Sequence, residues 1–395
     1  MQSNSWWLFL ASLFVLGALL KVYLLAIFAV MLAVISVLAR WWQKRALIGV
    51  IYRRRPFYWR GFPGEKINLR IEVENRKLLP ISWLRIHDPW PYTVGPEDDT
   101  QLVPTENPDI GLLVNLFSLR WFERVRRSYT LLLRKRGVYR VGPARLESGD
   151  LFGIFEQSGL TGEAEFLTVF PEPLQFSELR LPAEDPFGDR RVRRRLYEDV
   201  NQPMGVRGYH PEDDFRRVHW PASAHIGELQ VKVYQPVSAK VMVVCLNVTT
   251  SPHYWEGYYP ELLEHLVRAS AAIIQRSLED GYRVGLISNG SLAHSDQPFR
   301  IQANRSPGQL GHLLQTLAGV TPFVIGPFDR FLRAEMPRLP YGASLVIVSG
   351  TMTPALAETI LQLKQHGRRV TLLSFTTQDP PLIPGVQVLH RPFVL

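Results

Sequence analysis

The N-terminal apolar run constrains this chain more than any other feature. From Trp6 to Ala39 the only charged residue is Lys21. A single helix of that length, at about 1.5 Å per residue, would be roughly 50 Å long, whereas the hydrocarbon core of a bilayer is about 30 Å thick. We therefore expect a transmembrane α-hairpin with a turn near residues 17–21. A signal peptide is the alternative, but the run lacks a basic start and a small-residue cleavage site.

Basic and aromatic residues at the ends of this run predict its orientation. Tryptophans stand at both ends, as is typical of a membrane–water interface. Seven Lys and Arg residues follow between residues 40 and 60, a density typical of the cytoplasmic side. The net charge of +9 also suits an anionic membrane surface, and the single Cys245 excludes an internal disulfide. We predict an inner-membrane protein with residues 1–45 as anchor and its soluble body in the cytoplasm. A body facing outside, as an adhesion or transport module, is the topological alternative.

Residues 46–175 show the pattern of an antiparallel β-sandwich. In the segment EKINLRIEVEN, apolar Ile67, Leu69, Ile71 and Val73 alternate with polar residues, which predicts a half-buried strand. Similar short segments recur between Gly and Pro residues, and no helical stripe appears among them. Several short alternating strands of this kind favour a sandwich of two sheets.

Residues 239–395 show a different rhythm, in which apolar segments alternate with helical ones. The predicted buried strands are KVMVVCLNV, YRVGLIS, ASLVIVSG and RRVTLLSF, and four helices are expected around them. Strands that are apolar throughout predict a parallel sheet covered by helices on both faces. The segment between, residues 176–238, is interpreted as a basic linker over 176–205 followed by a distinctive motif. Its run RRVRRR is expected to lie against anionic lipid, and no nucleic-acid partner is expected.

The most distinctive stretch is RGYHPEDDFRRVHWPASAHIGELQVKVY, which begins at residue 207. Its adjacent carboxylates and guanidiniums favour a network that docks this loop onto a neighbouring domain or a partner, with Trp220 as a packing anchor. The candidate docking residues are Arg207, Tyr209, Asp213, Asp214, Arg216, Trp220, Ser223 and His225. The alternative is metal or acid–base chemistry, for which the residue types are present in His210, Asp213, Asp214 and His219. Their spacing fits no closed metal motif, so we assign no catalytic residue.

This stretch resembles the signature of the family called domain of unknown function 58. That signature runs Arg-x-Tyr-x-x-Gly-Asp-Asp-x-Arg-x-Ile-x-Trp-x-Ala-Ser-Ala-Arg. Three positions depart from it: Glu212 replaces Gly, His219 stands where Asp or Asn is common, and His225 replaces Arg. The resemblance extends to the family's Asp-x-Phe-Gly end of a strand pair, here Asp150 to Gly153. It implies a membrane hairpin, a β-sandwich, the signature and a Rossmann-like von Willebrand A-like α/β domain.

A von Willebrand A-like domain would imply a divalent-metal site after its first strand, with the motif Asp-x-Ser-x-Ser. The matching residues are Asn247, Thr249 and Ser251, and Ser349 ends the later strand that usually leads to an acidic ligand. Mg²⁺ relies on carboxylates and water, and these positions offer no carboxylate. We therefore expect a degenerate metal site and no cofactor, with weak Mg²⁺ binding as the open possibility.

The sequence contains no complete catalytic constellation, so we hypothesise a non-enzymatic interaction or assembly protein at the membrane. The resemblance implies two partners, a MoxR-type AAA ATPase and a membrane protein with a transglutaminase-like domain. A metal-dependent enzyme that uses His210, Asp213, Asp214 and His219 is the alternative function.

Overall fold

The computed structural model describes residues 3–150, 155–179, 198–211, 213, 215, 218–236, 240–251, 257–293, 295, 297–340 and 342–393. The chain divides into two compact units, Met1–Phe170 and Pro171–Leu395. The finer division expected from the sequence, with boundaries after residues 45, 175 and 238, stays a prediction.

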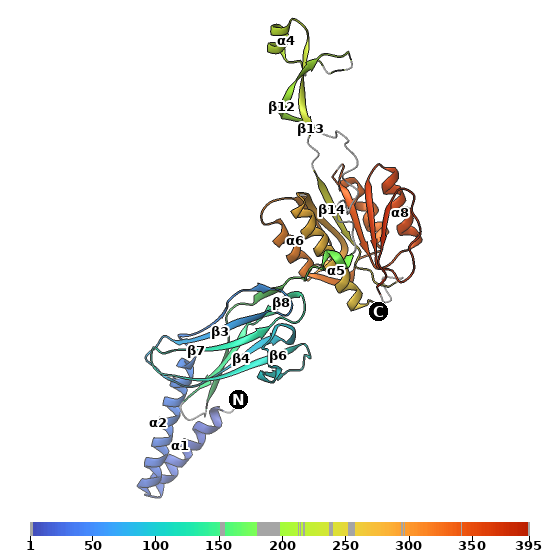
Figure 1. Cartoon of the computed structure of the whole chain (residues 1–395). Coiled ribbons are helices and arrows are strands. Elements are labelled where there is room, and N and C mark those ends of the chain that lie inside the picture. Colours follow the sequence, from blue (N-terminus) through green and yellow to red (C-terminus); the bar gives the residue numbers. More distant parts are fainter. Residues whose placement is uncertain are drawn as a thin grey trace. The chain divides into compact units, whose positions relative to one another are not determined.

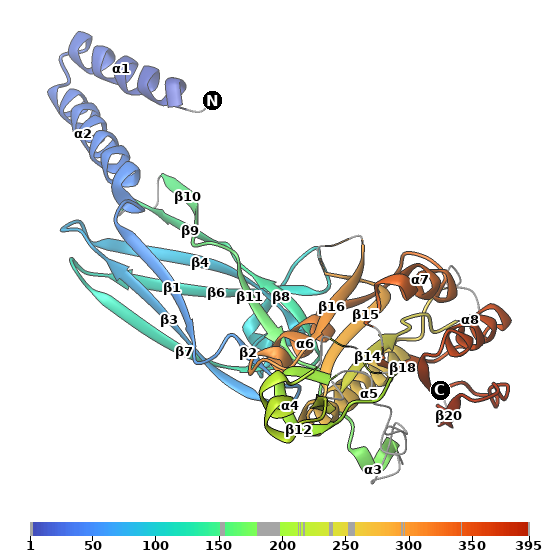
Figure 2. The same cartoon turned by 90° about the horizontal axis from the view of Figure 1, so that it is seen from above.

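The first unit begins with the expected pair of apolar helices, α1 (Ser3–Leu19) and α2 (Tyr23–Ala46), which lie side by side (Figures 1 and 2). The turn between them places Lys21 at φ +52°. Gly17 allows their close approach, because a Cβ there would come within 2.8 Å of the Ala26 backbone nitrogen. The helix α2 is longer than expected and continues through Trp41, Lys44 and Arg45. Among the described helices, α2 alone is long and apolar enough to cross a bilayer.

A β-rich region completes the first unit (Figure 1). Its first sheet has the order β1 (Val50–Pro56), β3 (Lys66–Asn75), β7 (Arg124–Leu132). The second sheet has the order β10 (Glu156–Thr161), β9 (Ala144–Gly149), β4 (Ile81–Pro91), β6 (Ile110–Leu119), β5 (Leu102–Pro104). The third has the order β2 (Arg60–Gly61), β11 (Glu165–Val169), β8 (Gly137–Val141). Neighbouring strands are antiparallel except β2 and β11, which are parallel.

The sheets of this region share one hydrophobic core. Ile67, Leu69, Ile71 and Val73 of β3 are buried, as the alternation in the sequence predicted. They join a cluster that includes Trp90 and extends over the inward faces of the sheets. The structure therefore confirms an antiparallel β-rich region that follows the helix pair.

The second unit contains a β-hairpin that the sequence analysis had interpreted in part as a linker. After the short helix α3 (Phe176–Leu179), β12 (Glu198–Gly208) pairs antiparallel with β13 (Gln230–Pro236), and α4 (Trp220–Ile226) lies between them. Residues 198–205 are therefore a strand and not irregular chain. The run RRVRRR lies outside the described residues. We call β12, α4, β13 and the loop between them the motif hairpin.

The remainder of the second unit is an α/β region (Figure 1). Its sheet has the order β16 (Pro298–Asn304), β15 (Arg283–Leu292), β14 (Val241–Leu246), β18 (Ser344–Ser349), β19 (Arg369–Ser374), β20 (Gln387–His390). The last five strands are mutually parallel, whereas β16 and the additional strand β17 (Val320–Val324) run antiparallel to β15. The helices are α5 (Pro260–Glu279), α6 (Gln309–Ala318), α7 (Phe328–Glu335) and α8 (Pro354–Gln365).

Both faces of this sheet are covered, because successive side chains of a strand point to opposite faces. On β14, Met242 faces α5, where its sulfur accepts a hydrogen bond from Ser277 at 2.9 Å. The next residue, Val243, belongs to the core that Leu332 of α7 and Ile360 of α8 share. The four predicted strands and four predicted helices of this region are present, and β16, β17 and β20 were missed.

Candidate functional site

An ion pair fixes the loop of the motif hairpin. Arg207, at the end of β12, donates from Nη1 to Asp213 Oδ2 at 2.6 Å and from Nη2 to Oδ1 at 2.5 Å. The backbone amide of His210 donates to the same carboxylate at 2.9 Å. Bidentate pairing of this kind is among the stronger charge-assisted contacts. The guanidinium, with help from the amide, lowers the pKa of Asp213 to about 2, so the loop is held by a charged carboxylate at neutral pH.

The same loop leads into α4 through a cap that explains one departure from the signature. His219 Nδ1 accepts a hydrogen bond from the backbone amide of Ala222 at 3.0 Å, which makes His219 the N-cap of α4. Asp and Asn, the usual residues at this position of the signature, are preferred N-caps, so His219 fills the same role. Ser223 is buried, and its hydroxyl donates to the His219 carbonyl at 3.0 Å while accepting from the Gln230 amide at 2.8 Å. These bonds tie α4 to β13.

The motif hairpin carries aromatic side chains in contact with one another, of which Phe215 and Trp220 are exposed and Tyr209 is half-buried. Tyr209 and Phe215 meet edge to face with ring centroids 6.0 Å apart, and Phe215 meets Trp220 at 5.7 Å. Phe215 is 55% and Trp220 58% exposed, so Trp220 is not the buried packing anchor that we expected. Val206 and Ile226 are exposed as well. We call Tyr209, Phe215 and Trp220 the aromatic patch; exposed apolar clusters of this kind are typical of interaction sites.

Of the remaining candidate residues of the motif, the structure describes some and not others. His225 lies exposed in the last turn of α4. Three predicted or departing positions, Glu212, Asp214 and Arg216, lie outside the described residues, as do Phe152 and Gly153 of the second matched segment. The predicted carboxylate–guanidinium network is therefore represented by one pair in the described part of the loop.

Two residues of the enzymatic alternative, Asp213 and His219, are engaged in other contacts. Asp213 binds Arg207 and a backbone amide, and His219 caps a helix. Asp214 again lies outside the described residues. Within the described ranges, no group of three or more His, Cys, Asp or Glu side chains is arranged to hold a metal ion.

A second candidate site lies where the strand order of the α/β sheet reverses. Counted from β14 without β17, which pairs only with β15 off the main path of the sheet, the spatial order is 3-2-1-4-5-6. Successive connections therefore run in opposite directions on either side of the β14–β18 pair. Ligands of open α/β sheets bind beyond the carboxyl ends of the strands at such a point. Asn247 directly follows β14 and Ser349 ends β18, so the sequence placed two candidate residues at this edge.

Hydrogen bonds join these residues into a neutral network. Asn247 donates from Nδ2 to Ser349 Oγ at 2.9 Å, and its Oδ1 accepts from the Thr249 amide at 3.1 Å. Asn289, on β15, donates to Thr249 Oγ1 at 3.1 Å. The fourth candidate, Ser251, donates instead to the carbonyl of Gly257 at 3.2 Å. Sequence analysis missed Asn289, which lies within the buried part of β15.

This donor set does not fit a divalent cation. Backbone amides fix the orientation of both asparagine side chains, because the Asn247 and Asn289 oxygens accept from the amides of Thr249 and Val248. The Asn247 NH₂ group therefore points to the hydroxyls of Ser349 and Thr351. A cation would meet an amide donor where it needs an oxygen, and none of the network side chains is a carboxylate.

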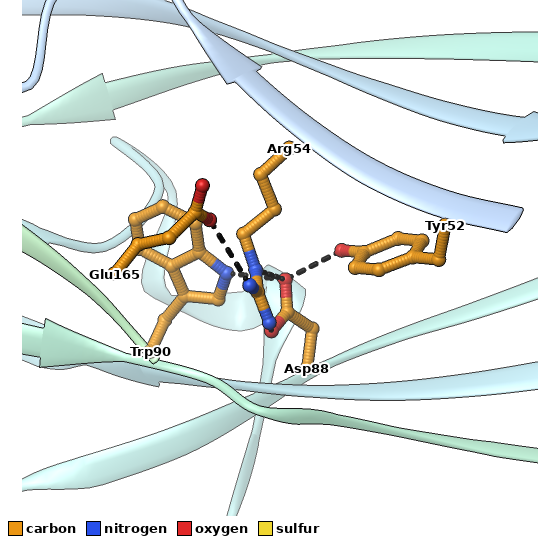
Figure 3. Close-up of polar contacts among 5 residues, drawn as sticks. All are labelled: Tyr52, Arg54, Asp88, Trp90 and Glu165. Atoms are coloured by element: carbon orange, nitrogen blue, oxygen red, sulfur yellow. Dashed lines mark hydrogen bonds and ion pairs between the residues drawn. The ribbon is translucent and has the colours of Figure 1, made fainter. Parts of the chain in front are cut away.

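The β-rich region contains a buried charged cluster that sequence analysis did not anticipate (Figure 3). Arg54 was counted among the seven basic residues that follow the apolar run, and its side chain is only 2% exposed. Its guanidinium donates to both carboxylate oxygens of Asp88, at 2.6 Å from Nη2 to Oδ1 and 2.9 Å from Nε to Oδ2. Tyr52 and Trp90 also donate to Asp88, at 2.6 and 2.9 Å, and Arg54 reaches Glu165 at 3.2 Å. The cluster links β1, β4 and β11.

Two likenesses to known sequences support the resemblance that the signature indicated. Residues 205–382 match the family described as Protein of unknown function DUF58. The chain is also 24% identical over 337 residues to the Uncharacterized protein YeaD of Bacillus subtilis (strain 168), with 82% of this chain and 76% of that protein covered. Neither description states an activity.

Solved structures resemble parts of the chain only weakly. Spo0M, a sporulation control protein from Bacillus subtilis, is 15% identical over 31% of this chain, with a TM-score of 0.19. The chain spans about half of the length of that structure, at 49%. A PapD-like domain of human CEP192 is 22% identical over 30% of this chain and 87% of its own, with a TM-score of 0.16. Likenesses at this level assign neither a fold nor a function.

Proposed function

We propose that this chain is a membrane-anchored, non-catalytic interaction protein that presents its motif hairpin to a partner protein. One observation carries the proposal: Phe215 and Trp220 of the aromatic patch are exposed, yet the loop that leads to them is held by the Arg207–Asp213 pair. A binding surface that is already ordered loses less conformational entropy when a partner docks. Exposed Trp and Tyr side chains are also enriched among the residues that dominate binding energy.

The anchor in this proposal is the helix pair, with α2 as the spanning helix. Its apolar run suits a bilayer, and Lys44 and Arg45 in its last turn suit the cytoplasmic side. The location in the inner membrane, with the body in the cytoplasm, follows from this reasoning. The 3-2-1-4-5-6 strand order with an antiparallel edge strand supports the proposal that the α/β region is a von Willebrand A-like domain.

The proposed partner is a MoxR-type AAA ATPase, with a transglutaminase-like membrane protein as a further member of the assembly. Both partner classes are implied by the family resemblance. The aromatic patch supports a protein partner in general, because its edge-to-face rings offer a rigid apolar surface of a kind that protein interfaces bury.

Affinity capture of the full chain from detergent-solubilised membranes, with and without ATP, tests this function. We expect an AAA ATPase to be recovered with the native chain. Trp220→Ala should weaken that recovery by about 30-fold, the loss expected when about 2 kcal/mol of interface energy is removed. Phe323→Ala is the matched control, because Phe323 is 73% exposed on β17, away from the motif hairpin sequence. Equal recovery with both variants, or repeated absence of the ATPase, would contradict the proposal.

A further inference from the structure

We propose that two turns of the β-rich region insert their side chains into the interface of an anionic phospholipid bilayer beside α2. The turns are residues 76–79, between β3 and β4, and residues 120–123, between β6 and β7. We call these turns and Ile48 the tip surface. The inference rests on the proposed membrane anchor and adds a second, peripheral contact with the same bilayer.

Hydrogen bonds place both turns at the end of α2. Lys77 Nζ donates to the Arg45 carbonyl at 2.6 Å and also to the Ala46 carbonyl, so the first turn contacts the last turn of α2. The Arg76 amide donates to the Gly49 carbonyl at 2.8 Å. The second turn joins the first through the Phe122 amide, which donates to the Lys77 carbonyl at 3.3 Å.

Large apolar side chains project from this surface. Leu78 is 75%, Trp121 64%, Phe122 63% and Ile48 64% exposed. Tight turns usually carry Gly, Asn, Asp or Pro, whose conformational or hydrogen-bonding properties suit a turn. Here the two central residues of the second turn are aromatic, and Phe122 has φ +52°. A bulky side chain in this left-handed region is strained, and such strain concentrates at functional sites.

The second turn is held in this conformation by polar contacts on its inner side. The Glu123 carboxylate accepts from the Arg120 amide at 2.6 Å, and the Glu123 carbonyl accepts from the Asn75 amide at 2.9 Å. The buried Asn75 side chain donates to the Arg120 carbonyl at 2.8 Å. These bonds fix the backbone of the turn while Trp121 and Phe122 remain outside the core.

The distance to the bilayer suits insertion into the headgroup layer. Trp41 of α2 is 46% exposed, lies under the Arg45 guanidinium at 4.8 Å, and is a residue type that marks the membrane interface. Arg45 follows Trp41 by four residues, about 6 Å along the helix. The headgroup layer is itself about 5–8 Å thick on each side. A turn bonded to Arg45 therefore stands within side-chain reach of that layer.

Charge favours an anionic lipid over a protein as the occupant. Exposed cations lie on the tip surface, at Arg76 and Arg120, and next to its segments in the sequence, at Lys44, Arg45 and Arg124. The carboxylate of Glu74 binds two of them, Arg76 at 3.0 Å and Arg124 at 3.1 Å. The surplus of positive charge attracts an anionic leaflet within a Debye length, and the bilayer is already present where α2 ends.

Spin labels on the full chain, reconstituted in vesicles of phosphatidylcholine and phosphatidylglycerol, test the inference. The labels are placed through Phe122→Cys, Phe57→Cys and Val34→Cys, and the native Cys245 is fully buried. Phe57 is the matched control because it is 73% exposed and follows β1, about 20 Å of extended chain from α2. Val34 lies in α2 and reports on the anchor alone. The measurement is the collision of each label with oxygen, which prefers lipid, and with a water-soluble nickel chelate.

We expect the labels at Val34 and Phe122 to collide more with oxygen than with nickel, and the label at Phe57 to show the reverse. A label at Phe122 that matches Phe57, while Val34 stays in lipid, would overturn the inference and leave the anchor intact. A label at Val34 that meets nickel would overturn the anchor and the inference with it. A label at Phe122 shielded from both reagents would show a protein cover and overturn the lipid assignment. Equal depth in pure phosphatidylcholine would overturn the requirement for anionic lipid.

Discussion

In the β-rich region, a buried charge joins neighbouring strands through the side chains that bind it. The Asp88 carboxylate accepts hydrogen bonds from Arg54, Tyr52 and Trp90, so none of the charge is left uncompensated. Burial and the Asp88 charge together raise the pKa of Tyr52 well above its usual value, so this phenol stays a donor at neutral pH. The cluster is therefore a structural link among three strands rather than an exposed cationic site.

Removal of Arg54 should destabilise the β-rich region strongly. Arg54→Met leaves the Asp88 charge buried without its guanidinium, and loss of one partner of a buried pair costs about 3–5 kcal/mol. Thermal unfolding of the full chain in detergent measures the effect. Arg55→Met is the matched control on the same strand, because the Arg55 side chain is 58% exposed and pairs with Glu72 at 3.1 Å. Glu72 keeps Arg126 as a partner at 3.0 Å in this variant, and the solvent-exposed guanidinium of Arg55 should contribute at most about 1 kcal/mol. Equal costs for both variants would contradict this assignment.

In the motif hairpin, the Asp213 carboxylate holds the loop between β12 and α4 through Arg207 and the His210 amide. The pKa of Asp213 is lowered from 3.8 to about 2 in the folded loop. The unfolded chain therefore takes up the proton at a higher pH than the folded one. The contribution of this ion pair is fully present above pH about 4 and is lost as the pH falls through about 2.

Titration of Asp213, followed by the carbon chemical shift of its carboxyl group, checks this prediction. We expect a midpoint near 2 in the native chain. Arg207→Gln removes the largest cause of the shift and should move the midpoint upward, toward 3.8. A native midpoint near 3.8 would mean that the ion pair does not form in solution.

At the scale of the elements, the sequence predicted the strands whose burial makes them apolar along the chain. The strands β14 and β18 are buried along their length, and apolar runs revealed them. The missed strands β17 and β20 are short and half-buried, so they have no such run. The strand β12 contains Pro203 and polar residues, and it is extended because it pairs with β13. Pairing between distant segments is not encoded in the local pattern.

The residues of the candidate sites were likewise predicted where the sequence carries a pattern and missed where distant segments meet. Asn247 and Ser349 were named because the von Willebrand A-like resemblance implies metal ligands after the two strands that these residues follow or end. Asn289 was missed because an amide within β15 gives no local sign that it will reach the Thr249 hydroxyl on the neighbouring connection. The burial of Arg54 was not predicted, because charged residues are usually exposed, although its period-two spacing from Tyr52 could have indicated an inward position.

At the scale of the whole molecule, topology decides which partners can reach the aromatic patch. We expect added protease to digest the body in inverted inner-membrane vesicles and to spare it in intact spheroplasts, because the cations that follow the apolar run mark the cytoplasmic side. The measurement is the size of the fragment that keeps the N-terminal helices, with a known cytoplasmic-facing membrane protein as the control. Digestion in intact spheroplasts would instead support a module that faces outside.

The connection between α2 and β1 has a mechanical consequence. Only Leu47, Ile48 and Gly49 separate the helix from the strand, and Lys77 bonds across this junction to the last carbonyls of α2. Leu47 also packs against the hydrophobic core of the β-rich region. The connection is therefore rigid, and it transmits a force on the β-rich region to α2 instead of absorbing it by bending. If α2 spans a bilayer as proposed, a load applied to the β-rich region would tilt α2 within that bilayer, in the direction of the pull.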